Sequence, residues 1–260
     1  MTSPRPERGY LLCTMPRSGS TMLCDLLTQT GVAGRPNSFF RPQSMANFAA
    51  DWGVPTQTLG SFDQSYVDTA IAQGTAGTGC FGMRIMWQNN MPGLLKRLGD
   101  LFPAASTDLE RFTAAFGKLR FIHLLRRDKV AEAVSYAIAE QSGLWHRNAD
   151  GSEMERIAPP AEPIYDYDQI HSLYQEVNDG HTHWQNWFQD QAIAPMRVTY
   201  EDLVDDPATQ LRGILGHIGL DPDKAANITP GTAKLADQRN TDWVARFRDE
   251  AGLAPAPQPT

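Results

Sequence analysis

The sequence contains only three cysteines in 260 residues, and their spacing does not match a metal site. Cys13 and Cys24 lie in apolar segments, and the odd total argues against a disulfide framework. We therefore expect packed thiols in a reducing compartment. The N-terminal stretch MTSPRPERGY also lacks the apolar core of a secretory signal. Together these absences predict a cytoplasmic protein.

Long apolar runs and an excess of positive charge are also missing. No run approaches the roughly 18 residues that a membrane span requires. Lys and Arg number 23 against 30 Asp and Glu, and a net charge of −7 argues against nucleic-acid binding. It leaves room for a local basic pocket that holds a small anion. A chain of this length can bury a sizeable core.

Strand-like and helix-like segments alternate along the chain, without an internal repeat. This alternation predicts an α/β fold, in which a mostly parallel sheet is covered by helices on both faces. Ligands bind such sheets at the carboxyl ends of the strands. GTAGTG at 74–79 follows a helix and is interpreted as a turn, and the Pro/Ala-rich residues 251–260 as a disordered tail. The predicted strands are 10–13, 80–87, 119–125 and one within 195–203; the predicted helices are 18–30, 65–73, 91–102, 128–145, 166–192 and 206–220.

The first candidate anion site is TMPRSGST, between the strand at 10–13 and the following helix. Gly19 lets the backbone approach a ligand, and the helix directs its free N–H groups and positive dipole end at the same spot. Arg17 adds a cation with several donors. No Lys precedes the Ser/Thr pair, as a nucleoside triphosphatase loop requires. The alternative is a simple helix N-cap, with Ser18 or Ser20 as the cap and Arg17 solvated.

The second candidate anion site follows the strand LRFIHLL, which ends in Arg126 and Arg127. Asp128 is suited to cap the next helix, and Ser135 lies about two turns into it. Two cations at the end of a buried strand are difficult to explain as core residues. The alternative is that both arginines are solvated or paired with Asp128. Taken together, the two sites predict a ligand with two separated anionic groups.

Seven motifs in one order carry a resemblance to a known family. They are YLLCTMPRSGSTML, GVAGRPNSFF, FGMRIMW, IHLLRRDKVAEAVSY, LW at 144–145, VTYEDLVDDP and ADQRNTDWVARFRDE. The chain resembles sulfotransferases that use 3′-phosphoadenosine 5′-phosphosulfate (PAPS), and in particular the bacterial trehalose sulfotransferase family and its relatives that sulfate lipopolysaccharide sugars. The resemblance implies one α/β domain over residues 1–250, with a P-loop-like parallel sheet flanked by helices.

The resemblance also implies roles for individual residues. PAPS is the implied co-substrate, without a metal, and Arg17 is a catalytic residue that stabilises the leaving phosphate. Arg126 and Ser135 match residues that bind the 3′-phosphate, and Tyr200 matches one that contacts adenine. The implied cofactor-binding residues are Arg17, Ser18, Gly19, Ser20, Thr21, Arg126, Ser135, Tyr200, Arg239 and Asn240, the last two in a segment that closes over the 3′-phosphate.

The pattern departs from the family in the loop after the first helix. Trehalose-type members carry P-x-E-F-F there, and the Glu is the general base. Here the stretch is PNSFF, and Ser38 cannot act as a base near neutral pH. Arg35 and Arg41 flank the loop and favour an anionic acceptor, and Trp52 is a candidate for stacking on a sugar ring. The predicted acceptor-binding residues are Arg35, Ser38, Phe39, Arg41 and Trp52.

Two residues could replace the missing base, His146 and Glu140, at the far end of the helix predicted at 128–145. His146 follows Trp145 and has a suitable ordinary pKa of roughly 6.5. We therefore assign it the catalytic base role, against the alternative that it is a surface residue of WHRNADG. His181 and His183 are two residues apart on a helix and are interpreted as surface residues rather than metal ligands.

Three functions remain open at this point. The first is a sulfotransferase that acts on a carbohydrate or glycolipid. The second is a non-catalytic module that binds PAPS or its product, which the loss of the Glu at position 38 favours. The third is a P-loop kinase of small molecules, which would need the missing loop Lys and a magnesium site. The family resemblance also implies a homodimer.

Overall fold

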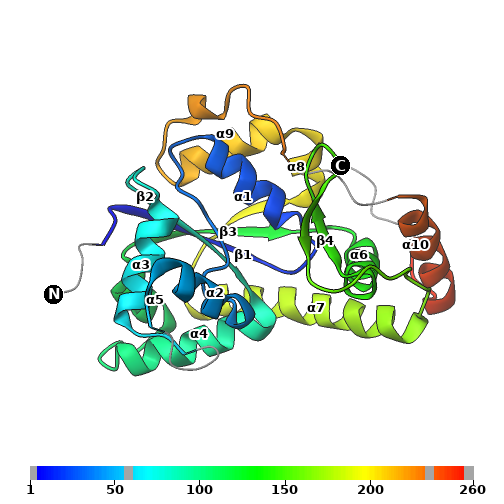
Figure 1. Ribbon diagram of the computed structural model, residues 1–260, viewed down its shortest axis with the longest axis horizontal. Helices are drawn as coiled ribbons and strands as arrows, with labels where there is room; N and C mark the ends of the chain where they lie inside the picture. Colours follow the sequence, from blue (N-terminus) through cyan, green and yellow to red (C-terminus); the bar gives the residue numbers. More distant parts are fainter. Residues whose placement is uncertain (1–4, 56–60, 232–236, 255–260) are drawn as a thin grey trace.

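A four-stranded parallel sheet forms the centre of the protein (Figure 1). The computed structural model describes residues 5–55, 61–231 and 237–254. The spatial order of the strands is β2-β1-β3-β6, and every neighbouring pair is parallel. All four strands therefore end at the same edge of the sheet, where α/β proteins bind ligands. The strands are β1 (Arg8–Thr14), β2 (Cys80–Met86), β3 (Leu119–Leu125) and β6 (Met196–Thr199).

Helices cover both faces of the sheet, as the apolar strands predict. Along β1, Tyr10 and Leu12 belong to one core cluster, and Leu11 and Cys13 belong to the other. The first cluster is covered by α1 (Ser20–Gln29), α8 (Tyr200–Asp205) and α9 (Pro207–His217). The second is covered by α2 (Pro42–Trp52), α3 (Gln64–Thr75), α4 (Trp87–Leu101), α5 (Asp108–Phe116) and α7 (Tyr167–Asp190). Figure 1 shows the two layers above and below the strands. The predicted α/β fold is confirmed.

A third cluster packs beside the sheet, between α7, α6 (Lys129–Ser142) and α10 (Gln238–Ala251). Phe247 of α10 is fully buried there, and Arg248 pairs with Asp128 at the start of α6 at 2.7 Å. The C-terminal segment is thereby fixed against α6, the helix that follows Arg126 and Arg127. Of the tail predicted at 251–260, Ala251 is still helical and Leu253 packs on this cluster. Residues 255–260 lie outside the described residues.

The predicted helix at 128–145 ends earlier than its apolar pattern indicates. Gly143 adopts a φ of +70° and caps α6 at Ser142. The chain then forms an antiparallel hairpin of β4 (Leu144–Arg147) and β5 (Glu153–Arg156). His146 therefore lies on a strand rather than on a helix. This correction matters because the hairpin projects over the ends of the parallel strands (Figure 1).

The structure also decides the predictions for the turn, the cysteines and the two histidines of α7. In GTAGTG, the first two residues end α3 and residues 76–79 form the predicted turn. All three cysteines are buried and free. His181 is only 5% exposed and lies 3.3 Å from Glu132, so its assignment to the surface is wrong, whereas His183 is exposed. Helices α2, α5, α8 and α10, the hairpin and a short 3-10 turn (Pro222–Ala225) were not predicted. Within the described ranges, none of the helices is long and apolar enough to cross a membrane.

Candidate active site

The loop between β1 and α1 is held by its own side chains. Thr14 Oγ1 lies within hydrogen-bonding distance of Ser18 Oγ and of the carbonyl oxygen of Leu124, and Ser18 Oγ lies 2.8 Å from the carbonyl oxygen of Met15. The N-cap of α1 is Gly19, with a φ of +87° and no side-chain cap. The N-cap alternative with Ser18 or Ser20 is therefore wrong. The first N–H groups of α1 remain available for an anion.

Arg17 connects this loop to two later segments. Its Nε donates to Ser135 Oγ on α6 at 3.1 Å, and its Nη1 donates to the carbonyl of Trp145 on β4. Burial, followed by the nearby charge of Arg126, lowers the pKa of Arg17 to about 10. Arg17 stays charged at neutral pH, and its unfavourable position beside a second cation would be relieved by a bound anion.

The two arginines after β3 have different surroundings. Arg127 is paired with Asp202 at 3.0 Å and lies 3.8 Å from Glu201. Arg126 lies over the ring of Tyr200, and its buried Nε has no hydrogen-bond partner in the described part of the chain. Asp128 caps α6 and pairs with Arg248 instead of either arginine. Of the pair, Arg126 is therefore the one suited to bind a ligand.

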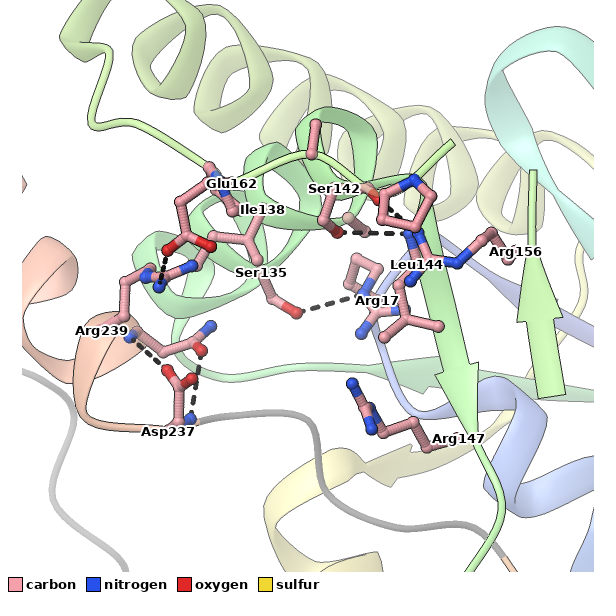
Figure 2. A pocket seen from close by; sticks show the side chains of 15 residues that line it. Arg17, Ser135, Ile138, Ser142, Leu144, Arg147, Arg156, Glu162, Asp237 and Arg239 are labelled. Atoms are coloured by element: carbon pink, nitrogen blue, oxygen red, sulfur yellow. Dashed lines mark hydrogen bonds and ion pairs between the residues drawn. The ribbon is translucent and has the colours of Figure 1, made fainter. Parts of the chain in front are cut away.

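A cavity of about 340 Å³ opens beside Arg17 and Ser135. Arg147 and Arg156 reach it from the hairpin, and Arg239 reaches it from α10 on the opposite side (Figure 2). Arg239 is paired with Glu162, and Asn240 completes a capping box with Asp237. The cavity thus combines four predicted cofactor-binding residues with two arginines that sequence reasoning missed. The predicted residues are Arg17, Ser135, Arg239 and Asn240.

Comparison with known proteins decides the family. Residues 9–250 match the model described as Stf0 sulphotransferase. The chain belongs to the Stf0 sulfotransferase family. It is 30% identical to trehalose 2-sulfotransferase of Mycobacterium tuberculosis (strain ATCC 35801 / TMC 107 / Erdman), over 95% of this chain and 97% of the relative. The corresponding enzyme of Mycolicibacterium smegmatis is 28% identical, over 93% and 95%. These matches confirm the family that the seven motifs predict.

Among solved structures, the chain is similar to the sulfotransferase domain from the Synechococcus PCC 7002 olefin synthase. The TM-score is 0.45 and the identity is 15%, with 100% of this chain and 93% of that chain covered.

A second group of polar side chains lies on the other side of the loop between β1 and α1. Arg84 of β2 donates through Nε to Ser38 Oγ at 2.8 Å, and through Nη1 to Thr21 Oγ1 at 2.9 Å and Ser20 Oγ at 3.2 Å. Sequence reasoning missed Arg84, although a cation within the apolar strand CFGMRIM was a visible signal. Ser38 is 5% exposed, and its hydroxyl oxygen accepts the hydrogen bond from Arg84.

The hairpin brings His146 to the same place. Its Nε2 lies 3.0 Å from Thr21 Oγ1 and 3.5 Å from Glu155 Oε2 on β5. Arg41 Nη1 lies 3.4 Å from the other oxygen of Glu155. Burial, then the charges of Arg17, Arg84 and Arg41, lower the pKa of His146 to about 3. His146 is therefore neutral at physiological pH.

The predicted acceptor-binding residues do not all face this site. Phe39 is 4% exposed and packs against Phe48 and Trp52 in the second core cluster. Trp52 is stacked on the Phe48 ring at 5.0 Å. Both aromatic rings therefore contribute to the core rather than to an open platform. Arg35 is exposed, and Arg41 is paired with Glu155.

Metal ligands do not gather at this site. In residues 5–55, 61–231 and 237–254, no three His, Cys, Asp or Glu side chains form a group that could hold a metal ion. The site residues are instead mainly cationic and hydroxyl-bearing, as suits the binding of phosphate and sulfate groups.

Proposed function

We propose that the protein transfers a sulfuryl group from PAPS to a hydroxyl of a carbohydrate or glycolipid. The observation that carries this proposal is the link between Arg17 and Ser135, because it joins the loop at the end of β1 to the helix after β3. A donor with phosphates at both its 5′ and 3′ positions needs two such sites side by side. The family membership and the unpartnered Nε of Arg126 support the same donor.

The donor-binding roles follow from these surroundings. The loop from Arg17 to Thr21 and the first N–H groups of α1 would hold the 5′-phosphosulfate. Arg126, Ser135, Arg239 and Asn240 would hold the 3′-phosphate. Tyr200, which packs near both Gly19 and Arg126, would contact the adenine.

In the reaction, the acceptor oxygen attacks sulfur and the bond from sulfur to the bridging oxygen breaks. The electron pair of that bond goes to the 5′-phosphate, and the hydroxyl proton must go to a base. Arg17 and the loop amides are suited to stabilise the charge that develops on the leaving phosphate. Arg17 and the loop amides are held in place before the reaction. They therefore stabilise the charge that develops in the transition state more than they stabilise the bound donor.

A sugar is the acceptor class that the relatives favour, since both are named trehalose 2-sulfotransferase. Ser38 stands where trehalose-type members have a Glu, so the acceptor of this chain can differ from trehalose. Arg35 and Arg41 flank that segment and favour a sugar that carries an anionic group. We also propose a cytoplasmic homodimer, as the family resemblance implies.

Two measurements test the proposal. Transfer of ³⁵S from labelled PAPS should be detected with at least one of trehalose, glucose 6-phosphate, glucuronic acid or a lipopolysaccharide extract. Calorimetry should show binding of adenosine 3′,5′-bisphosphate in the presence of a chelator. Binding without any transfer would favour the non-catalytic module, and a strict magnesium requirement for binding would favour the kinase.

A further inference from the structure

Glu155 on the β4–β5 hairpin is the carboxylate that the structure connects to the phosphate-binding loop. It reaches Thr21 through His146, in two contacts of 3.5 Å and 3.0 Å. We propose that Glu155 is the general base that takes the proton from the acceptor hydroxyl. This inference rests on the proposed sulfotransferase function. It assigns the role that Ser38 cannot fill.

Ser38 and Glu155 approach the same atom from different directions. Ser38 is connected to Thr21 Oγ1 through Arg84, in contacts of 2.8 Å and 2.9 Å. Glu155 is connected to Thr21 Oγ1 through His146. Thr21 follows the first residue of α1, directly beside the free N–H groups that suit the transferring group. A carboxylate on the hairpin can therefore serve an acceptor hydroxyl that faces this loop, just as one at position 38 could.

The contacts of His146 argue that it is not the proton acceptor. Thr21 Oγ1 lies at hydrogen-bonding distance from Nε2, and Glu155 Oε2 lies 3.5 Å from the same ring nitrogen. A lone pair on Nε2 would lie 3.5 Å from a carboxylate oxygen, which is repulsive, so the tautomer with hydrogen on Nε2 is favoured. In that tautomer Nε2 donates and cannot accept a proton. His146 is then a positioning residue, which donates to Thr21 and lies beside the carboxylate of Glu155.

This tautomer also gives the Thr21 hydroxyl a defined role. Its oxygen accepts from Arg84 Nη1 and, in this tautomer, from His146 Nε2, which uses both lone pairs. The hydroxyl hydrogen of Thr21 is left to donate to an anionic oxygen of the donor. The same network thus holds the donor on one side and the base on the other.

Other carboxylates in this region are less suited to the role. Glu140 is exposed on α6 and accepts from Gln169 at 3.2 Å. Glu176 accepts from Gln88, and its pKa is raised by burial and by the charge of Glu140. These contacts direct both carboxylates toward other helices rather than toward the phosphate-binding loop. Glu155, by contrast, lies 3.5 Å from His146, which contacts Thr21 in that loop.

The proposed step conserves atoms and charge. As the acceptor oxygen bonds to sulfur, its O–H bond breaks and the proton passes to a carboxylate oxygen of Glu155. The bond between sulfur and the bridging oxygen breaks, and its electron pair remains on the 5′-phosphate of the departing adenosine 3′,5′-bisphosphate. The sulfated sugar leaves, and Glu155 releases its proton to water.

The test compares Glu155→Gln and Glu155→Asp with Glu153→Gln. Glu153 is a matched control, because it lies on the same strand, is exposed and is paired with Arg156. For each variant, kcat is measured by ³⁵S transfer from PAPS to the best acceptor of the panel above. The affinity for adenosine 3′,5′-bisphosphate and the thermal midpoint are measured in parallel. His146→Gln is included to separate positioning from proton transfer.

We expect Glu155→Gln to lower kcat by about a hundredfold or more, with unchanged bisphosphate affinity. Glu155→Asp should recover part of the loss, His146→Gln should lose less than Glu155→Gln, and Glu153→Gln should match the wild type. Near-normal kcat in Glu155→Gln, or a loss of bisphosphate affinity in that variant, would overturn the inference while the proposed function stands. A wild-type protein that binds the bisphosphate but sulfates no acceptor would overturn both.

Discussion

The guanidinium carbon of Arg126 lies 4.8 Å from the centroid of the Tyr200 ring. The same ring also lies against Gly19, where an added Cβ would lie 2.5 Å from Tyr200 Cδ2. Tyr200 therefore connects the two candidate anion sites through direct packing. It opens α8 immediately after β6, which explains how a residue so distant in sequence reaches the loop.

The different surroundings of Arg126 and Arg127 lead to a first prediction. Arg126→Ala should weaken binding of adenosine 3′,5′-bisphosphate by about 10- to 150-fold, because a charge-assisted hydrogen bond contributes roughly 1.5–3 kcal/mol. Arg127→Ala should leave the affinity nearly unchanged, because that side chain is paired with Asp202. Calorimetry on both variants checks the difference, and equal affinities would show that the 3′-phosphate is assigned to the wrong residue.

The close packing of Gly19 against Tyr200 gives a second prediction. Gly19→Ala should lower both stability and donor affinity, because the residue has a positive φ and the added methyl meets the ring. Gly31→Ala is the matched control, since Gly31 has a φ of +68° but an added Cβ would meet nothing within 4 Å. Each variant should lose about 1 kcal/mol for the backbone conformation. Only Gly19→Ala should lose more and bind the bisphosphate more weakly, as urea unfolding and calorimetry would show.

Much of the fold could be predicted because its signals are local. LRFIHLL is a buried strand on hydrophobicity alone, and Asp128 marks the start of the next helix through its capping side chain. The end of that helix was misplaced because Leu144 and Trp145 continue its apolar pattern. Gly143, in the left-handed conformation, was the available stop signal.

The proximity of Arg17 and Ser135 could be predicted for the same reason, since both lie in motifs that follow strand ends. The acceptor side depends on contacts between distant segments. Glu155 meets His146 only because the hairpin pairs their strands. Phe39 and Trp52 were assigned to the acceptor from their place in the chain. The structure packs them together in the core.

A third prediction concerns acid stability. His123 on β3 is 1% exposed, and burial, followed by the charges of His181, Lys129 and Arg197, lowers its pKa to about 3. The unfolded chain takes up this proton near pH 6.5, so the contribution is complete above that pH and is lost as pH falls toward 3. The protonation of His123 in the unfolded chain should lower the free energy of unfolding by roughly 2 kcal/mol between pH 8 and pH 5.

Urea unfolding of the wild type and of His123→Leu at both pH values measures this contribution. The difference between the two pH values should shrink by about that amount in the variant. His183→Gln, at an exposed position on α7, should leave the difference as it is in the wild type. An undiminished difference in His123→Leu would show that His123 is not held neutral by the fold.

The last prediction concerns the charge of His146, and it separates the two candidate bases. Because burial and three arginines lower its pKa to about 3, the ring should stay neutral from pH 8 down to pH 5. Carbon-13 NMR of labelled histidines, with the signal assigned by its loss in His146→Gln, should show no titration in that window, whereas the same residue in urea should titrate near pH 6.5. Titration of His146 should therefore cause no decline in turnover as the pH falls through 6.5. A midpoint near 6.5 in the folded protein would restore the histidine as a base of ordinary strength, and a chemical shift typical of hydrogen on Nδ1 would free Nε2 to accept the acceptor proton in place of Glu155.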